Sequence, residues 1–313
     1  MRSPRSTLTL STFLLLLSLA PSSSTCPPPP HPSGTFNVTL ASGRVFQLFT
    51  PWSEYPCSSY CTGPPRDKRP VVINWHGCNS HVPVAAYQEQ VSRVEQAASD
   101  YGYYALTPVG TREGLIAEFG WNTHGIKCGE IGVDDFGFAD DLLGWVEENL
   151  CADMERVYST GFSTGAFHSY ALGCTRPGRF RGVAPVAGSM GRLYKGGCEE
   201  GGAVSVMSFH SRGDKTVPYD GNLEWMSQEE ATELWKARNG CTGNETSTVT
   251  YQSDTTTCTR YECPGAPVED CTLTGLDHCW VGGRSGGFET PGSCVKQEGD
   301  IDATKHMFET WER

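Results

Sequence analysis

The sequence predicts an α/β fold, with a mostly parallel sheet, helices on both of its faces, and disulfides that stabilise it. Short apolar runs that suit strands alternate along the chain with longer segments of helical periodicity. Fourteen cysteines all follow an N-terminal leader, and an even number in such a chain indicates disulfides. Of 313 residues, about 290 remain after that leader, enough to bury the core of one large domain.

The leader, residues 1–25, is typical of a secretory signal peptide. Arg2 and Arg5 give it a basic start, and residues 8–20 form an apolar run that is too short for a membrane span. An uncleaved anchor is the alternative. We expect cleavage between Ala20 and Thr25, and therefore a secreted, extracellular protein.

Two further regions follow the leader. Residues 26–34 contain four consecutive prolines and indicate a stiff N-terminal stub. Residues 35–313 contain no linker-like stretch, so we expect them to form one domain.

The first half of this domain is expected to begin with a hairpin and continue into the centre of the sheet. β-rich runs at 35–40 and 44–50 flank the turn residues Ala41-Ser42-Gly43. Strand, helix and strand patterns then follow at 70–75, 84–101 and 103–107. Residues 109–133 form a loop long enough to suggest a functional role.

A helix is expected from the Asp134-Asp135 pair to Leu150. One of the two aspartates should cap the helix, and both favour its positive end. A pair of carboxylates serving acid–base catalysis or a metal is the alternative.

The second half continues the alternation of strands and helices. Strands are expected at 157–158, 182–187, 203–210, 249–252, 258–262 and 271–274. Helices are expected at 166–172, 229–239 and 301–311.

The formal net charge of −12 argues against nucleic acids and anionic membranes as partners. Two cysteine pairs, Cys57 with Cys61 and Cys258 with Cys263, have loose metal-like spacing. Neither has a second tight pair or a histidine pair nearby, so we expect disulfides and no metal. The pairing itself does not follow from the sequence. Asn37 and Asn244 begin glycosylation sequons and should lie on the surface.

Residues 155–174 carry the strongest chemical signal. Gly161-Phe162-Ser163-Thr164-Gly165 lies between a predicted strand and a predicted helix, the context in which a sharp turn exposes a serine nucleophile. The same pattern recurs around Ser285, where neither a strand nor a helix flanks it. We therefore interpret Ser163 as a nucleophile and Ser285 as a residue of a glycine-rich loop.

A nucleophilic serine needs a histidine base and a carboxylate that orients it. The candidate histidines after Ser163 are His168, His210, His278 and His306. His278 follows the last predicted strand in a loop, whereas His168 and His306 lie within predicted helices and are expected to be structural. Asp214 follows a strand end, where the sites of open sheets lie, and is the preferred acid. Asp220, Asp254 and Asp277 are rivals.

Two backbone N–H groups are candidates for an oxyanion hole. Thr164 begins the helix after the serine, so its N–H lacks an intrahelical acceptor. Cys78 ends the His76-Gly77-Cys78 turn after a buried strand, where Gly77 allows close backbone approach. In the simpler alternative this is a tight turn whose cysteine only forms a disulfide.

Taken together, these motifs resemble the extracellular polyhydroxybutyrate depolymerase and feruloyl esterase family of α/β hydrolases. The motifs that carry the resemblance, in the family's order, are His76-Gly77-Cys78, Gly120-Trp121-Asn122, Val133-Asp134-Asp135 with Gly137-Phe138, Gly161-Phe162-Ser163-Thr164-Gly165, His210 with Asp214 and Val217-Pro218-Tyr219, and His278 with Trp280, Gly282 and Gly283. The resemblance implies an α/β-hydrolase catalytic domain at 35–313 with Ser163, Asp214 and His278 as its triad. Departures at Leu276-Asp277, Val281 and Asn79-Ser80 bear on substrate fit.

The resemblance implies a secreted serine esterase that works through an acyl-enzyme, without a cofactor, as a monomer on a polymer-attached or polymer-derived ester. A feruloyl esterase of plant cell-wall polysaccharides is favoured, because the chain has no room for the binding domain and linker of many polyester depolymerases; such a depolymerase is the alternative. Trp121, Trp280 and Tyr219 could line an aromatic acyl pocket or belong to the core. A non-catalytic secreted binding protein and a serine peptidase on this scaffold are weaker hypotheses. Activity should fall below about pH 6, where histidines titrate.

Overall fold

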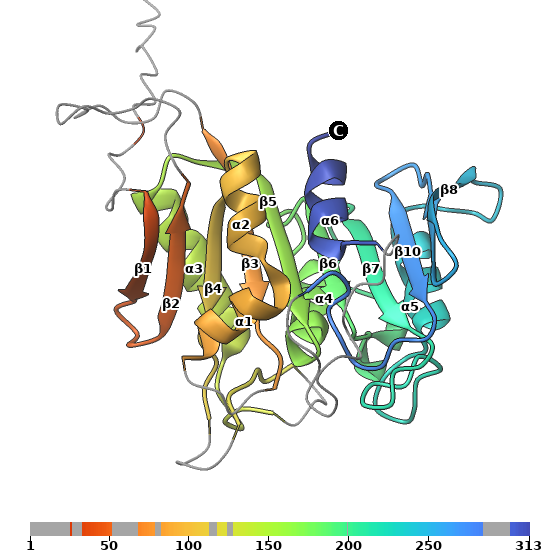
Figure 1. Cartoon of the computed structure of the whole chain (residues 1–313), viewed down its shortest axis with the longest axis horizontal. Helices are drawn as coiled ribbons and strands as arrows, with labels where there is room; N and C mark the ends of the chain where they lie inside the picture. The colour runs from red at the N-terminus through yellow and green to blue at the C-terminus, as the bar shows by residue number, and fades with distance from the viewer. Residues whose placement is uncertain are drawn as a thin grey trace, which may run out of the picture.

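A computed structural model describes Cys26 and residues 33–51, 68–78, 83–112, 118–123, 128–198, 200–283 and 301–313. A sheet of ten strands organises these residues, in the order β1-β2-β4-β3-β5-β6-β7-β10-β9-β8 (Figure 1). The central strands run parallel to one another, and the strands at both ends pair antiparallel.

The expected elements of the first half are present. The predicted hairpin is β1 (Gly34–Thr39) with β2 (Val45–Thr50), paired antiparallel from Gly34 with Thr50 to Thr39 with Val45. The next elements are β3 (Arg69–Trp75), α1 (Val84–Ser92), α2 (Val94–Tyr101), β4 (Tyr104–Pro108) and α3 (Asp135–Asn149).

The expected helix at 84–101 is two helices. Arg93 adopts a left-handed backbone with φ of 60°, which ends α1 and begins α2. Ser92 supports the break, because its hydroxyl accepts from the Val94 N–H and from the Asn74 amide. Helical periodicity continues through the break, so the pattern alone could not reveal it.

The second half contains the remaining strands and helices. In chain order these are β5 (Ala152–Phe162), α4 (Thr164–Thr175), β6 (Gly182–Val186), the 3₁₀ turn η1 (Arg192–Gly196), β7 (Ser205–Ser211), α5 (Gln228–Arg238), β8 (Ser247–Gln252), β9 (Thr256–Tyr261), β10 (Val268–Leu273) and α6 (Ala303–Trp311). The sequence placed β5 at only two residues, although it is the longest strand described.

Helices cover both faces of the sheet, as the alternating pattern predicted (Figure 1). One apolar core lies between the sheet and α3, α4 and α5. The second lies between the sheet and α2 and α6. Successive residues of β3 show the division, because Val71 and Ile73 belong to the first core and Val72 to the second.

Five disulfides join described residues: Cys26–Cys151, Cys78–Cys128, Cys174–Cys198, Cys241–Cys263 and Cys258–Cys271. The disulfide-stabilised fold that the sequence predicted is therefore confirmed. Cys258 and Cys263 bond to different partners, which removes the zinc alternative for that pair. Within the described part of the chain, no helix combines the length and the apolar character that crossing a bilayer requires.

Candidate active site

Ser163 lies in a strained turn between β5 and α4. Its φ of 54° and ψ of −118° are unfavourable for a residue with a side chain. The flanking glycines permit the turn, because a Cβ on Gly161 would overlap the Gly165 backbone, and one on Gly165 would overlap the Trp75 and His76 carbonyl oxygens. This is the strand–turn–helix context that the motif requires.

The backbone around Ser163 is held from two sides. The Ser163 N–H donates to the Val186 carbonyl at 3.0 Å, and the Ser163 carbonyl accepts from Ala166 and Phe167. Gly77 lies directly against it, because a Cβ there would stand 3.2 Å from the Ser163 Cβ. The loop predicted to donate the Cys78 N–H is thus next to the serine and to Thr164.

Several bonds fix this loop after β3. The His76 ring is buried, with Nε2 accepting from the Gly110 N–H at 2.9 Å and Nδ1 2.7 Å from the Gly77 carbonyl. Because Nε2 accepts a hydrogen bond, the ring is neutral, and burial lowers the pKa of His76 to about 4. The Trp121 indole donates to the His76 carbonyl, and Cys78 is bonded to Cys128.

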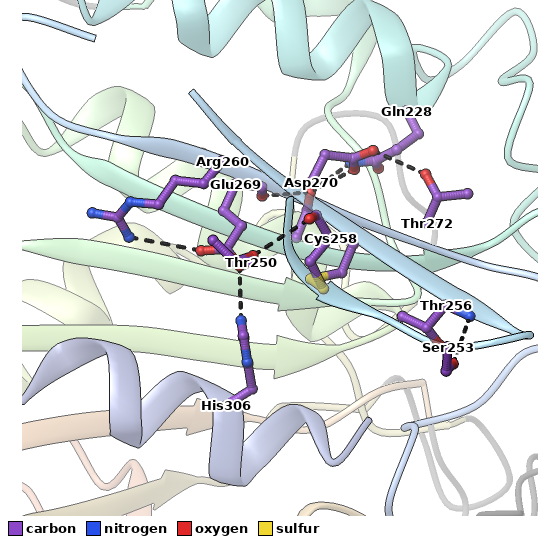
Figure 2. Close-up of a disulfide and its surroundings, with 12 residues drawn as sticks. Gln228, Thr250, Ser253, Thr256, Cys258, Arg260, Glu269, Asp270, Thr272 and His306 are labelled. Atoms are coloured by element: carbon purple, nitrogen blue, oxygen red, sulfur yellow. Dashed lines mark hydrogen bonds and ion pairs between the residues drawn. A yellow bond between two sulfur atoms is a disulfide. The ribbon is translucent and has the colours of Figure 1, made fainter. Parts of the chain in front are cut away.

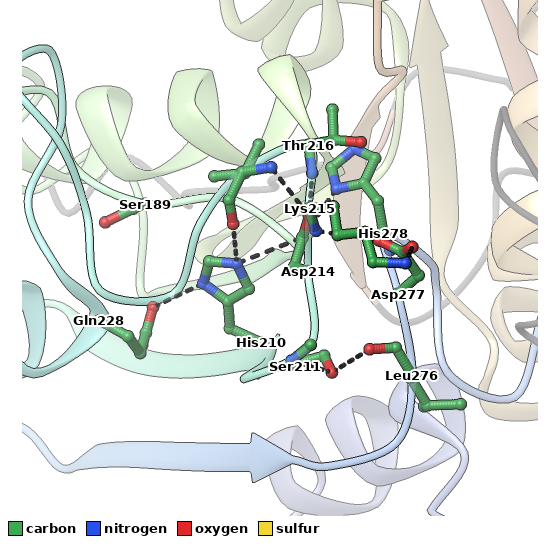
Figure 3. Close-up of polar contacts among 12 residues, drawn as sticks. Ser189, His210, Ser211, Asp214, Lys215, Thr216, Gln228, Leu276, Asp277 and His278 are labelled. Atoms are coloured by element: carbon green, nitrogen blue, oxygen red, sulfur yellow. Dashed lines mark hydrogen bonds and ion pairs between the residues drawn. The ribbon is translucent and has the colours of Figure 1, made fainter.

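Asp214 and His278 meet at the carboxyl edge of the sheet. His278 Nδ1 lies 2.8 Å from Asp214 Oδ2, and both residues are buried (Figure 3). Asp214 follows β7, and His278 follows β10, which is parallel to β7 and adjacent to it. The His278 ring packs 4.9 Å from the Phe162 ring, beside Ser163. The structure therefore gathers the three predicted residues from the ends of β5, β7 and β10.

The Asp214 carboxylate is well provided with donors. Oδ1 accepts from the Thr216 and Val217 N–H groups at 2.9 and 2.8 Å. Burial raises the pKa of Asp214, but hydrogen bonds from His210 and His278 outweigh it and bring the pKa well below its usual range. The carboxylate thus stays ionised, as a group that orients a histidine must.

A second histidine contacts the same oxygen. His210 Nε2 lies 3.3 Å from Asp214 Oδ2 and 2.9 Å from the Val217 carbonyl (Figure 3). The sequence placed His210 among the candidate histidines but did not predict its contact with Asp214. The available signal was its spacing four residues before Asp214, at the end of a strand.

Asp277, one of the rival acids, joins the two loops instead. Its Oδ1 accepts from the N–H groups of Lys215 and His278, each at 2.9 Å. The other rivals, Asp220 and Asp254, are exposed.

The remaining histidine and aspartate candidates have structural surroundings. His168 is buried against Trp75 and Trp121, and His306 bonds Glu269 at 2.8 Å. Asp134 caps α3 by accepting from the Gly137 N–H, so the capping prediction is confirmed. Asp135 is buried and bonds Arg44 at 2.8 Å.

The aromatic residues expected at an acyl pocket do not fit that role. Trp121 and Trp280 are 0% and 1% exposed, and their indole N–H groups bond His76 and Thr304. A side chain with no accessible surface cannot line an open pocket. Tyr219 is 4% exposed, with its hydroxyl bonded to Thr272. All three belong to the core, which was the alternative for them.

Both sequon asparagines, Asn37 and Asn244, are exposed, as a surface position requires. Four predictions lie outside the described residues: the signal peptide, most of the stub at 26–34, the Cys57–Cys61 pair and the loop around Ser285.

No family model matches the chain. A probable feruloyl esterase C from Aspergillus niger is 32% identical over 124 residues, which are 39% of each chain. Feruloyl esterase D from Neurospora crassa is 28% identical over 178 residues, 55% of this chain and 54% of the relative. A poly(3-hydroxyoctanoate) depolymerase from Pseudomonas fluorescens is 25% identical over 139 residues, 40% of this chain and 48% of the relative. The aligned regions thus span well under two thirds of these relatives.

Solved structures resemble the chain over more of its length. An acetyl xylan esterase from Aspergillus awamori aligns with a TM-score of 0.54 at 12% identity, covering 79% of this chain and 94% of its own. An α/β-hydrolase enzyme from a Medee basin deep-sea metagenome library aligns with a TM-score of 0.54 at 15% identity, covering 89% and 97%. The chain therefore has the α/β-hydrolase fold, and its relatives are feruloyl esterases and a polyester depolymerase, the family that its motifs indicated.

Proposed function

We propose that the protein is a secreted serine esterase that hydrolyses carboxylic esters through Ser163, His278 and Asp214. One observation carries the proposal: His278 bonds Asp214 at 2.8 Å in loops beside a serine in a strained strand-to-helix turn. A carboxylate that orients a histidine near a nucleophilic serine is the arrangement that acyl transfer needs. The feruloyl esterase relatives support this reaction class.

The first half of the reaction forms an acyl-enzyme. His278 donates its Nδ1–H to Asp214, so Nε2 is the nitrogen that accepts the Ser163 proton. The serine oxygen bonds to the ester carbonyl carbon, and the carbonyl oxygen becomes an oxyanion. The N–H groups of Thr164 and Cys78 stabilise that charge. The carbon–oxygen ester bond then breaks, and the alcohol leaves with the proton from His278.

In the second half of the reaction, water hydrolyses the acyl-enzyme. His278 takes a proton from water as the water oxygen attacks the acyl carbon, and the same two N–H groups stabilise the second oxyanion. The bond to Ser163 breaks, the serine recovers its proton, and the carboxylic acid leaves. No cofactor takes part.

A feruloyl ester of a plant cell-wall polysaccharide is the favoured substrate, because two of the relatives described above are feruloyl esterases. A polyester depolymerase is the second candidate, favoured by the poly(3-hydroxyoctanoate) depolymerase relative. Acidic charge, the predicted leader and the exposed sequons support a secreted, glycosylated protein that binds neither nucleic acid nor membrane. That it acts as a monomer is part of the proposal.

The test is ester hydrolysis by the secreted protein and by Ser163→Ala. The substrates are methyl ferulate, a short acetyl ester and a polyhydroxybutyrate film. Ferulate release that the variant lacks supports the feruloyl proposal. Film clearance without ferulate release keeps the mechanism and moves the substrate to polyesters. A folded wild type that hydrolyses none of the three would contradict the proposal and favour a non-catalytic binding protein.

A further inference from the structure

His210 is a buried histidine that the mechanism above does not use. It lies at the end of β7, its side chain has no exposed surface, and Nε2 points at two acceptors, the Asp214 carboxylate and the Val217 carbonyl. A nitrogen that faces only acceptors must carry a proton. Nε2 is therefore a donor.

The other ring nitrogen also faces an acceptor. Nδ1 lies 3.4 Å from Gln228 Oε1 (Figure 3). The orientation of that amide follows from its partners, because Gln228 Nε2 lies 2.9 Å from the Asp270 carboxylate and 2.7 Å from the Ser208 hydroxyl. The amide nitrogen must face the carboxylate, so the amide oxygen faces His210. A proton on Nδ1 as well satisfies this contact.

The charges around His210 favour the doubly protonated ring. Asp214 lies on one side, and Asp270, on the adjacent strand β10, lies behind Gln228. The Tyr219 ring lies 5.5 Å from the His210 ring, and the exposed Arg212 guanidinium lies over the Tyr219 ring at 4.4 Å. Helix α4 contributes the Tyr170 hydroxyl, which bonds Gln228. Asp214 thus places a negative charge beside His210, whereas burial raises the pKa of Asp270, and the Arg212 guanidinium is solvent-exposed.

We propose that His210 is a positioning residue for the Asp214 carboxylate, held as an imidazolium between Asp214 and Gln228. The inference rests on the proposed function. The cation fixes Oδ2 in line with His278 Nδ1 and counterbalances the carboxylate charge. Because one carboxylate then serves two histidines, it stabilises a protonated His278 less than a lone carboxylate would.

Two variants separate the proton donor from the charge. His210→Gln places a neutral amide nitrogen where Nε2 was, so it keeps a donor for Asp214 but loses the cation. His210→Phe loses both. The matched control is His306→Gln, which removes a histidine that bonds a buried carboxylate, Glu269, away from the site.

The first measurement is the pH dependence of kcat/KM on methyl ferulate or on whichever ester the wild type hydrolyses. We expect the acid limb of His210→Gln to move up by about one pH unit, the size of effect that one nearby charge exerts. In His210→Phe the same shift is joined by a fall of about 100-fold, the cost of misplacing a catalytic group. His306→Gln should leave the profile unchanged. An acid limb that stays in place in His210→Gln overturns the inference.

The second measurement does not depend on turnover. ¹⁵N-histidine NMR at pH 7 distinguishes an imidazolium from either neutral tautomer, and the signals missing from His210→Gln identify His210. An imidazolium pattern supports the inference, and a neutral pattern overturns it. If the wild type hydrolyses no ester, the proposed function fails, yet this spectrum still decides the state of His210. Should His210→Phe not fold, His210→Gln and the spectrum suffice.

Discussion

Two buried histidine–carboxylate clusters contact strand β10, one through Glu269 and the other through Asp270 and Gln228. Glu269 and Asp270 are neighbours on β10, so their side chains point to opposite faces of the sheet. Glu269 faces α6 and bonds His306 of that helix at 2.8 Å (Figure 2). It also bonds Thr250 of β8 at 2.6 Å and lies 3.7 Å from Arg260 of β9. Asp270 faces α5, where it accepts a hydrogen bond from Gln228 (Figure 2). Gln228 in turn contacts His210, which contacts Asp214 (Figure 3).

The clusters differ in whether the carboxylate lies within a strand or in a loop that follows a strand. Glu269 lies within β10, beside the Cys258–Cys271 disulfide, and its donors Thr250 and His306 lie in β8 and α6. Asp214 lies in a loop after a strand, and its histidine partner lies in another such loop next to Ser163. A histidine bonded to a carboxylate is thus no sign of catalysis by itself. Position at the carboxyl edge beside a nucleophile is what distinguishes the pair.

The sharpest test of this comparison is one isosteric change in each cluster. Asp214→Asn should lower kcat by about 10⁴-fold, because the amide holds the histidine in the wrong tautomer. Glu269→Gln should keep kcat within about twofold and lower the free energy of unfolding by about 1–3 kcal/mol, the worth of a hydrogen bond to a charged group. Steady-state kinetics and urea unfolding of both variants check this. Equal losses of kcat in the two would erase the distinction.

One disulfide lies near each cluster, and we expect the loss of each to affect stability and kcat differently. Removing Cys78–Cys128, which closes 50 residues, should cost about 4 kcal/mol, and removing Cys258–Cys271, which closes 13, about 3 kcal/mol. Only the first holds the loop beside Ser163, so only the Cys78→Ala/Cys128→Ala variant should also lose kcat, by about tenfold or more. Melting curves and kinetics on both double variants decide this. A fully active variant without Cys78–Cys128 would show that the loop holds its place unaided.

The chain order and the strand ends were enough to predict which residues meet at the site. Asp214 and His278 each follow a strand, and parallel neighbouring strands bring such positions to one edge. The contact of His210 with Asp214 could not be predicted from the sequence, because it depends on how the loop after β7 folds back. The pairing of the cysteines could not be predicted either, since sequence spacing does not fix distances in space.

The burial of Trp121 and Trp280 shows a different limit. Both lie in loops, where aromatic residues suggest an exposed pocket wall. The loops fold back instead, and each indole N–H satisfies an acceptor in the core, the His76 carbonyl for Trp121 and the Thr304 hydroxyl for Trp280. A loop assignment predicts no burial, whereas periodic elements such as β3 do reveal their buried positions.

Acid should destabilise the loop after β3, which contains His76, and the cluster around Glu269 in different pH ranges. The folded-state pKa of His76 is about 4, below the usual 6.5, so the folded protein binds fewer protons than the unfolded chain between these values. The contribution of His76 to the free energy of unfolding is therefore complete above pH 6.5. As the pH falls toward 4, that free energy decreases by about 3 kcal/mol. Burial raises the pKa of Glu269, but the bonds from His306 and Thr250 outweigh it and lower the pKa, so its contribution is lost only below about pH 4.5.

Urea unfolding of wild type and His76→Gln from pH 7 to 4.5 isolates the first effect. The glutamine can still accept from the Gly110 N–H but does not titrate in this range. Glu89 opposes the trend, because burial raises its pKa to about 7 and stability therefore rises as it is protonated. The difference between the two proteins removes that contribution. Glu269→Gln is the control, and it should follow the wild type over this range. A His76→Gln protein whose stability changes as much as the wild type's would contradict the assignment.

The smallest expected effect concerns Asp277, the aspartate beside the base. Its carboxylate oxygen accepts from the N–H groups of Lys215 and His278 and so joins the loop of the acid to the loop of the base. Asp277→Asn keeps an oxygen acceptor, so kcat should fall less than about threefold, whereas Asp277→Ala should lose both bonds and about tenfold in kcat. The loss of the exposed Lys215 ion pair in either variant contributes little. Kinetics on the same ester as for Asp214→Asn check this, because a 10⁴-fold loss in Asp277→Asn would make Asp277 the acid and would reduce Asp214 to a partner of His210.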